Sequence, residues 1–277
     1  MTVTRFAPSP TGYLHLGHAY SALFASRAAA GDAGSFLLRI EDIDPVRCKQ
    51  EFADALFEDL HWLGLKWQEP VRHQSQHLAD YTAALDILRS RGLIYPCFCT
   101  RSEIEREAQG AAHAPHASDG SPIYTGTCRH LSQTQRTEKL ARYGTANWRL
   151  DVAAAIQTTG PLVWHDRVQG RIEAQPQSFG DVVLARKDVP TSYHLSVTVD
   201  DHLQGVTLVT RGEDLFASTH IHRLLQALLG YEPPDYHHHG LKTDATGRRY
   251  AKRDQSVTLR ALRADGVAPE SIIGLAC

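Results

Sequence analysis

The first forty residues alternate between strand-like and helix-like segments, and this alternation limits the possible fold more than any other feature. Residues 2–7 form a short β-prone run that ends at Pro8, and residues 35–40 form a second, apolar run. Between them, residues 17–30 are rich in alanine and end before Gly31, which predicts a helix. A strand–helix–strand unit of this length places its two strands parallel, so we expect an α/β fold with helices on the faces of a parallel sheet.

The whole chain divides into three predicted parts. Residues 97–180 differ in sequence pattern from the residues before them. Their β-like runs follow a loop that is rich in alanine, glycine, histidine and proline. We therefore expect an insertion at 97–190 between the two halves of a Rossmann-type parallel sheet, which residues 1–96 and 191–277 carry. The further elements expected are helices at 49–63, 75–91 and about 216–229, strands at 146–151, 161–165, 181–186, 193–199 and 206–210, loops at 109–122 and 237–239, a basic turn around 242–253, and one or two short helices at the end.

Charge and composition exclude several classes of protein. The 277 residues include 29 Lys and Arg against 31 Asp and Glu, so the chain is no simple polycationic nucleic-acid binder. Any contact with nucleic acid must come from a local patch, and residues 242–263 carry seven Lys or Arg against two Asp. The apolar stretches are too short for a transmembrane helix, and the first residues lack the apolar core of a secretory signal. We expect a cytoplasmic protein with no membrane partner.

The turn between the first strand and the first helix predicts a site for nucleotide phosphates. In a parallel sheet, ligands bind at this edge, where the N-terminus of a helix offers free N–H groups. His15 and His18 are three residues apart, so their rings share one face of the helix, while Gly12 and Gly17 let the backbone approach a ligand closely. The two imidazoles can donate hydrogen bonds to phosphoryl oxygens as charge builds up in a transition state. Taken alone, the motif also fits a Pro-Gly turn with two surface histidines.

Four sequence blocks, in the order found in a known family, give this turn a specific meaning. Pro-Ser-Pro-Thr-Gly followed by His-Leu-Gly-His resembles the first signature of the class I aminoacyl-tRNA synthetases, in the form used by the glutamyl and glutaminyl branch. Residues 40–44 resemble the acidic motif that follows the second strand in that branch. Residues 193–201 together with 209–214 resemble its pair of strands in the second half of the sheet, and residues 249–253 resemble its KMSKS-type loop. The loop departs from the pattern at Arg249, where a lysine is common, and at Ala251, where a serine is common.

This resemblance implies a ligase that activates L-glutamate with ATP, accompanied by Mg²⁺, to form glutamyl-adenylate. Arginine suits the recognition of glutamate because its planar fork grips a carboxylate with two hydrogen bonds. Arg5 and Arg211 each end a predicted strand and are placed to converge, although either one alone also fits a surface salt bridge. By resemblance, the glutamate site is Arg5, Phe6, Ala7, Pro8, Ser9, Glu41, Tyr193 and Arg211, and the catalytic and ATP-binding residues are His15, Gly17, His18 and Lys252.

Five cysteines, an odd number, indicate a reducing compartment and a metal site more than a disulfide framework. Cys97, Cys99 and Cys128 can supply three thiolates to zinc, and spacing alone favours His113, His116 or His130 as the fourth ligand. Buried free cysteines are the alternative. The resemblance implies instead a structural zinc site of Cys97, Cys99, Tyr124 and Cys128, in an insertion that binds the acceptor tRNA. Cys48 and Cys277 have no predicted role.

The number of residues that follow the KMSKS-type loop differs between members of this branch and helps to distinguish them. Only 25 residues follow Lys252, so we expect no anticodon-binding domain. This resembles a truncated paralogue of glutamyl-tRNA synthetase, which implies a monomer that transfers glutamate to queuosine in the anticodon of tRNA(Asp). The alternatives are the catalytic half of a glutamyl-tRNA synthetase, which would charge the tRNA 3′ end, and a non-catalytic tRNA-binding paralogue.

Overall fold

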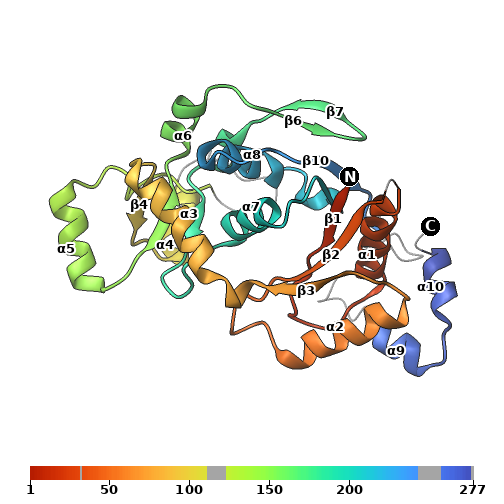
Figure 1. The fold of residues 1–277 in the computed structure, drawn as a ribbon. Coiled ribbons are helices and arrows are strands. Elements are labelled where there is room, and N and C mark those ends of the chain that lie inside the picture. Colours follow the sequence, from red (N-terminus) through yellow and green to blue (C-terminus); the bar gives the residue numbers. More distant parts are fainter. Residues whose placement is uncertain (32, 111–122, 243–256, 276–277) are drawn as a thin grey trace.

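Three parallel strands form the first half of the fold. A computed structural model describes residues 1–31, 33–110, 123–242 and 257–275 (Figure 1). In it, β1 (Val3–Phe6) pairs with β2 (Ser35–Ile40), and β2 pairs with β3 (Gln68–His73). The helix α1 (Leu16–Ala29) connects β1 to β2, as predicted, and packs its alanines against the sheet. The predicted α/β class with a parallel sheet is confirmed.

The second half of the fold joins the first at β1. Strand β9 (Leu208–Gly212) lies beside β1, and the Thr207 N–H donates a hydrogen bond of 3.0 Å to the Val3 carbonyl. β9 belongs to a second, four-stranded sheet, which it forms with β10 (Asp235–His239) and β6 (Val163–Asp166), both parallel, and with the antiparallel strand β7 (Gly170–Glu173). The carboxyl ends of β1 and β9 therefore lie together, at the place where α/β sheets bind ligands.

A small antiparallel sheet lies apart from these strands, with helices around it (Figure 1). It consists of β4 (Ile94–Cys97), β5 (Asn147–Leu150) and β8 (Val183–Ala185). The helices α4 (Arg101–Gly110) and α5 (Gln133–Tyr143) follow β4 along the chain. The β6–β7 hairpin, although it comes from the predicted insertion, pairs with β10, and the division at residues 96 and 190 stays a prediction.

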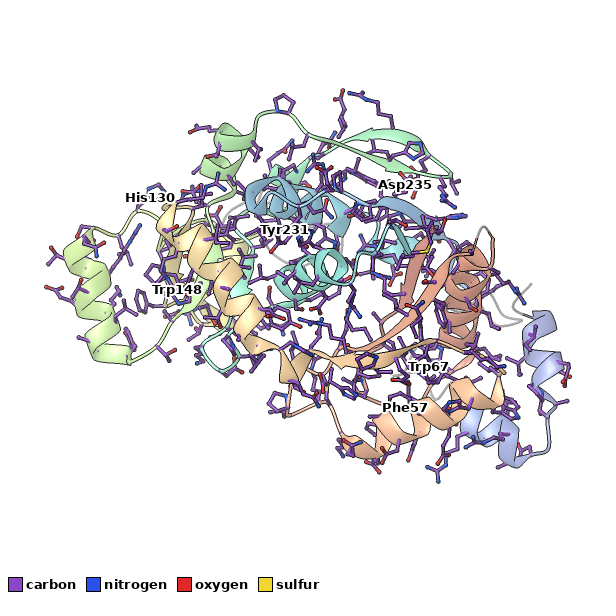
Figure 2. All side chains as sticks on the ribbon, in the orientation of Figure 1. Phe57, Trp67, His130, Trp148, Tyr231 and Asp235 are labelled. Atoms are coloured by element: carbon purple, nitrogen blue, oxygen red, sulfur yellow. The ribbon has the colours of Figure 1, made fainter. Side chains whose placement is uncertain are left out.

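The remaining helices cover the sheets or fill the space between them. On one face, α2 (Gln50–Trp62) packs near β3, where the Phe57 and Trp67 rings lie 6.0 Å apart (Figure 2). No helix in the described ranges is both long and apolar enough to cross a bilayer. The other elements are η1 (Gln74–Gln76), α3 (Leu78–Ser90), α6 (Val152–Thr159), η2 (Pro176–Phe179), α7 (Tyr193–Leu203), η3 (Glu213–Leu215), α8 (Ser218–Leu229), α9 (Leu259–Ala264) and α10 (Pro269–Leu275).

Two predicted elements within the described residues are wrong, and nearly all of the predicted loop at 109–122 and of the basic turn at 242–253 lies outside those residues. Residues 193–199 were expected as a strand because Leu195, Val197 and Val199 alternate with polar residues, but they form the start of α7. This helix is buried on nearly all sides, and its polar members are satisfied internally, as where the Thr198 hydroxyl donates to the His194 carbonyl at 2.8 Å. A helix that is buried on all sides does not show the apolar pattern with a period of 3.6 residues. A prediction based on alternating apolar and polar residues therefore assigns it wrongly to a strand.

Residues 237–239 were expected as a polar loop, and they instead end the central strand β10. The strand is held by parallel neighbours, β9 on one side and β6 on the other. His238 and His239 are buried there, so the polarity of the segment reflects side-chain partners inside the protein and not contact with water.

Candidate active site

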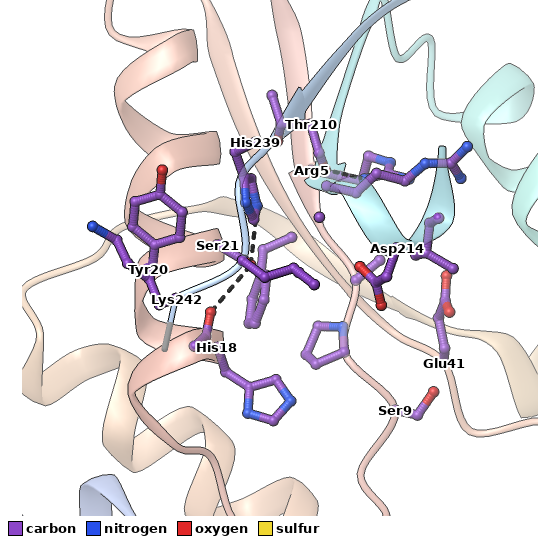
Figure 3. A pocket seen from close by; sticks show the side chains of 18 of the residues that line it. Arg5, Ser9, His18, Tyr20, Ser21, Glu41, Thr210, Asp214, His239 and Lys242 are labelled. Carbon is purple, nitrogen blue, oxygen red and sulfur yellow. Dashed lines mark hydrogen bonds between the residues drawn. The ribbon is translucent and has the colours of Figure 1, made fainter. Parts of the chain in front are cut away.

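A cavity of about 550 Å³ opens at the carboxyl ends of β1 and β9. It brings together all the described residues that were predicted to bind glutamate or ATP, namely Arg5, Phe6, Ala7, Pro8, Ser9, His15, Gly17, His18, Glu41, Tyr193 and Arg211. Lys252, with Arg249 and Ala251, lies outside the described residues. Figure 3 shows Arg5, Glu41 and Asp214 on one side of the cavity, and Tyr20 and Lys242 on the other.

The two predicted histidines form the N-terminal cap of α1. His15 Nδ1 accepts a hydrogen bond from the Gly17 N–H at 3.1 Å, and His18 Nδ1 accepts one from the His15 N–H at 3.2 Å. Because both Nδ1 atoms are acceptors, a neutral ring at either position carries its proton on Nε2. The ring centroids are 3.8 Å apart, so the two Nε2–H groups form a pair of donors at the positive end of a helix dipole.

The described residues on either side of the segment that carries Lys252 both contact the first half of the fold near this cavity. This segment begins after Lys242, whose ammonium lies 4.5 Å from the centre of the Tyr20 ring. It ends before Thr258, which forms an isolated antiparallel bridge with His15. The next residue, Leu259, donates its N–H to the Leu14 carbonyl at 2.8 Å. Within the cavity wall, Ser21 and the His239 ring hydrogen-bond at 3.1 Å (Figure 3).

Arg5 is neutralised by a buried carboxylate. Its Nε donates to Asp201 Oδ1 at 2.9 Å, and its Nη1 donates to the Thr210 carbonyl at 3.1 Å. Asp201 also accepts a hydrogen bond of 2.8 Å from the fully buried Arg39. Although burial opposes ionisation, the charges of Arg5 and Arg39 hold the pKa of Asp201 below its usual value. Arg5 is thus fixed between the two halves of the fold, with a counter-charge of its own.

Glu41 reaches the cavity from the carboxyl end of β2. Its side chain is buried and lies 3.5 Å from the Arg39 guanidinium. Burial raises the pKa of Glu41 to about 7, although Arg39 and Arg5 act in the opposite direction. A carboxyl group in this condition changes charge near neutral pH and can pair with a cation that enters the cavity.

The described residues that hold Arg211 are all neutral. It donates four hydrogen bonds, from Nε to His238 Nε2 at 3.1 Å, from Nη1 to the Tyr193 hydroxyl at 3.3 Å and to His222 Nδ1 at 3.2 Å, and from Nη2 to the Thr219 hydroxyl at 2.6 Å. Its side chain is buried, and no carboxylate in the described part of the chain forms an ion pair with it. A buried positive charge without a counter-charge favours an anionic ligand.

The three predicted cysteines lie close together at the end of β4 in the small sheet. The sulfur atoms of Cys97, Cys99 and Cys128 lie within 4.8 Å of one another. The Tyr124 hydroxyl is 3.6 Å from Cys99 Sγ and accepts the Cys128 N–H at 2.7 Å. His130, favoured by spacing, is exposed and does not belong to this group. Three sulfurs this close, on two buried cysteines and the half-buried Cys99, fit a tetrahedral metal ion, which separates its sulfur ligands by about 3.8 Å.

Several residues of the cavity were not predicted from the sequence. The lining also includes Tyr20, Ser21, Thr210, Gly212, Asp214, Leu215, His239, Leu241 and Lys242. The partners of the two arginines, namely Asp201, Thr219, His222 and His238, were missed as well. The acidic block ending at Asp201 contained a usable signal, because two adjacent acids in an apolar segment need buried cationic partners.

Known proteins resemble the chain over its whole length. The family model described as "tRNA synthetases class I (E and Q), catalytic domain" matches residues 1–277. A "Glutamyl-Q tRNA(Asp) synthetase" of Rhodobacter capsulatus is 48% identical over 276 residues, covering 98% of each chain. A protein of the same name from Nitratidesulfovibrio vulgaris is 42% identical, over 98% of this chain and 83% of its own.

A solved structure has a similar fold. The glutamate tRNA ligase of Elizabethkingia meningosepticum, in complex with its amino acid, is 25% identical, with a TM-score of 0.79. The comparison covers 99% of the present chain and 60% of the Elizabethkingia protein, so the chain spans about three fifths of that ligase.

Proposed function

Because this chain belongs to the class I tRNA synthetases of the glutamate and glutamine branch, we propose that it activates L-glutamate with ATP and transfers it to queuosine in the anticodon of tRNA(Asp). The observation that carries the first half is the buried Arg211 guanidinium with neutral partners, facing the same cavity as the buried Glu41. Arg211 suits the side-chain carboxylate of glutamate, and ionised Glu41 suits the α-ammonium group. The near-full-length match to glutamyl-Q tRNA(Asp) synthetases supports the second half.

The activation step joins the two sides of the cavity. The α-carboxylate of glutamate attacks the α-phosphorus of ATP, and pyrophosphate leaves with the bonding electrons. The Nε2–H groups of His15 and His18 and the N-terminus of α1 would stabilise the charge on the phosphates. Lys252 would add a cation, since Thr258, which closely follows its segment in the sequence, forms a bridge with His15. Mg²⁺ would accompany ATP as part of the substrate.

The transfer step needs a hydroxyl nucleophile. A hydroxyl of the acceptor attacks the carbonyl carbon of the adenylate, AMP leaves, and an ester forms. Queuosine carries a cyclopentene diol that resembles the 2′,3′-diol of a terminal adenosine, so one cavity can serve either acceptor. We expect labelled glutamate to go onto tRNA(Asp) that contains queuosine and not onto the same tRNA without it. Equal labelling of both tRNAs would favour a conventional synthetase half.

We also propose that the cysteine cluster binds one structural zinc ion, with Tyr124 as the fourth ligand. The Arg149 guanidinium lies 4.0 Å from the centre of the Tyr124 ring and holds this ring in place beside the three sulfurs. We expect one zinc per chain by metal analysis and its loss in Cys128→Ala, with reduced thermal stability, because a structural metal contributes folding energy. Cys48→Ala, which removes a thiol outside the cluster, is the matched control. Active protein that contains no zinc would contradict this proposal, and Tyr124→Phe with full zinc would change only the fourth ligand.

Glutamate binding is expected to weaken as the pH falls below about 7. Protonation of Glu41, whose pKa is raised to about 7, removes the negative charge that would hold the α-ammonium group. The KM for glutamate should therefore rise by up to about tenfold per pH unit below that value and level off above it. Glu41→Gln should bind glutamate weakly at every pH. The KM for glutamate is measured against pH by ATP–pyrophosphate exchange for wild type and for Glu41→Gln. If the KM of both proteins changes with pH in the same way, the group that titrates is not Glu41.

A further inference from the structure

Two buried histidines hold the Arg211 guanidinium, and the chemistry of activation does not use either of them. We propose that His222 and His238 are positioning residues that select an anionic substrate: as neutral acceptors they fix Arg211 and leave its positive charge for the carboxylate of the ligand. This inference rests on the proposed function, because it takes glutamate as the amino acid in the cavity.

The hydrogen bonds of His238 define where its proton lies. Its Nδ1 is 2.8 Å from Asp166 Oδ2, and a carboxylate only accepts, so Nδ1 carries the hydrogen. Its Nε2 is then left with a lone pair, which accepts the Arg211 Nε–H at 3.1 Å. Asp166 is itself fixed, since it also accepts backbone N–H groups from Val168 at 2.9 Å and from His238 at 3.2 Å. A second proton on His238 would point an N–H at the guanidinium.

The same reasoning applies to His222 on α8. A guanidinium only donates, so His222 Nδ1, at 3.2 Å from Arg211 Nη1, must accept. Its Nε2–H then donates to His194 Nδ1 at 3.1 Å. Burial, followed by the charge of Arg211, lowers the pKa of His222 well below its usual value, and the same causes lower the pKa of His238 to about 4. Both rings are therefore neutral at pH 7.

The two arginines of the cavity show what this arrangement achieves. Arg5 is paired with the Asp201 carboxylate, at 2.9 and 3.4 Å, and its charge is compensated within the protein. Arg211 has acceptors of similar geometry that carry no charge. A carboxylate beside Arg211 would neutralise its positive charge, as Asp201 neutralises that of Arg5. The cavity would then no longer require a negatively charged side chain on the bound amino acid, and the preference for glutamate over glutamine would fall.

An isosteric pair of variants tests this role. His222→Gln and His222→Glu introduce side chains of the same shape that differ in charge, and only the second can neutralise Arg211. We expect the ratio of kcat/KM for glutamate over glutamine, measured by ATP–pyrophosphate exchange, to stay within about threefold of wild type in His222→Gln and to fall at least about tenfold in His222→Glu. The loss should arise in the KM and calorimetric affinity for glutamate, with the KM for ATP unchanged.

A purely structural role predicts a different pattern, because the two variants would then change the ratio equally, and that result would overturn the inference. If His222→Glu fails to fold by circular dichroism, Thr219→Asp and Thr219→Asn provide the same comparison at the hydroxyl 2.6 Å from Arg211 Nη2. Wild-type protein without glutamate-dependent exchange would contradict the proposed function itself, before any variant is compared.

Discussion

Arg211→Ala is expected to lower glutamate-dependent ATP–pyrophosphate exchange by roughly 10²- to 10³-fold, the cost of leaving a buried carboxylate without its charged partner. In the proposed complex, the side chain of glutamate is removed from water and Arg211 supplies the compensating charge. Arg5 cannot replace it, because its guanidinium is already paired with Asp201. The loss should appear mainly as weaker glutamate binding, measurable by calorimetry as well as by exchange.

The matched control is Arg171→Ala. Arg171 is an exposed cation on β7 and lies outside the cavity lining. This variant should retain the exchange activity and the glutamate affinity of wild type. Arg211→Ala with activity within a few fold of wild type, and with its glutamate dependence intact, would remove Arg211 from the substrate site.

His18→Ala is expected to slow adenylate formation by roughly 10²- to 10³-fold, the usual cost of removing one donor that stabilises transition-state charge. The His18 Nδ1 accepts the His15 N–H at the start of α1, so a neutral ring carries its proton on Nε2, the nitrogen that would donate to the phosphates. That donor acts on charge that develops during the reaction, so the rate should fall while the KM for glutamate stays nearly unchanged.

Single-turnover formation of glutamyl-adenylate measures this rate without the transfer step. His18→Gln, which can place an amide N–H near the position of Nε2, should recover part of the rate. His202→Ala is the control, because that ring stacks on Tyr231 at 3.8 Å, outside the cavity lining. A rise in the KM for glutamate that equals the loss of rate would mean that His18 supports ground-state binding.

The first half of the fold could be predicted because its signals are local. β2 follows the predicted bounds, and α1 and α2 differ from them by only one residue at each end, since glycines and proline mark their limits. β10 and α7 could not be predicted in the same way. A polar segment became a central strand, and an alternating segment became a helix, because neighbours distant in sequence surround both.

The candidate site divides along the same line. The motif residues of the first turn are contiguous in sequence, so their chemistry could be read directly. The partners that define their charge are remote: Asp201 is 196 residues from Arg5, and Asp166 is 72 residues from His238. No local pattern links such pairs, so the sequence predicted two similar arginines and the structure distinguishes a compensated one from an uncompensated one.

The position of the glutamyl group on the tRNA tests the central claim most directly. The protein, ATP and radiolabelled glutamate would be incubated with queuosine-containing tRNA(Asp), and the tRNA would then be trimmed of its 3′-terminal CCA and cut into defined fragments. We predict that the label survives the trimming, lies in the anticodon fragment that contains queuosine, and is released by mild alkali because the bond is an ester. Label that disappears with the CCA end would contradict this account and identify a conventional charging reaction.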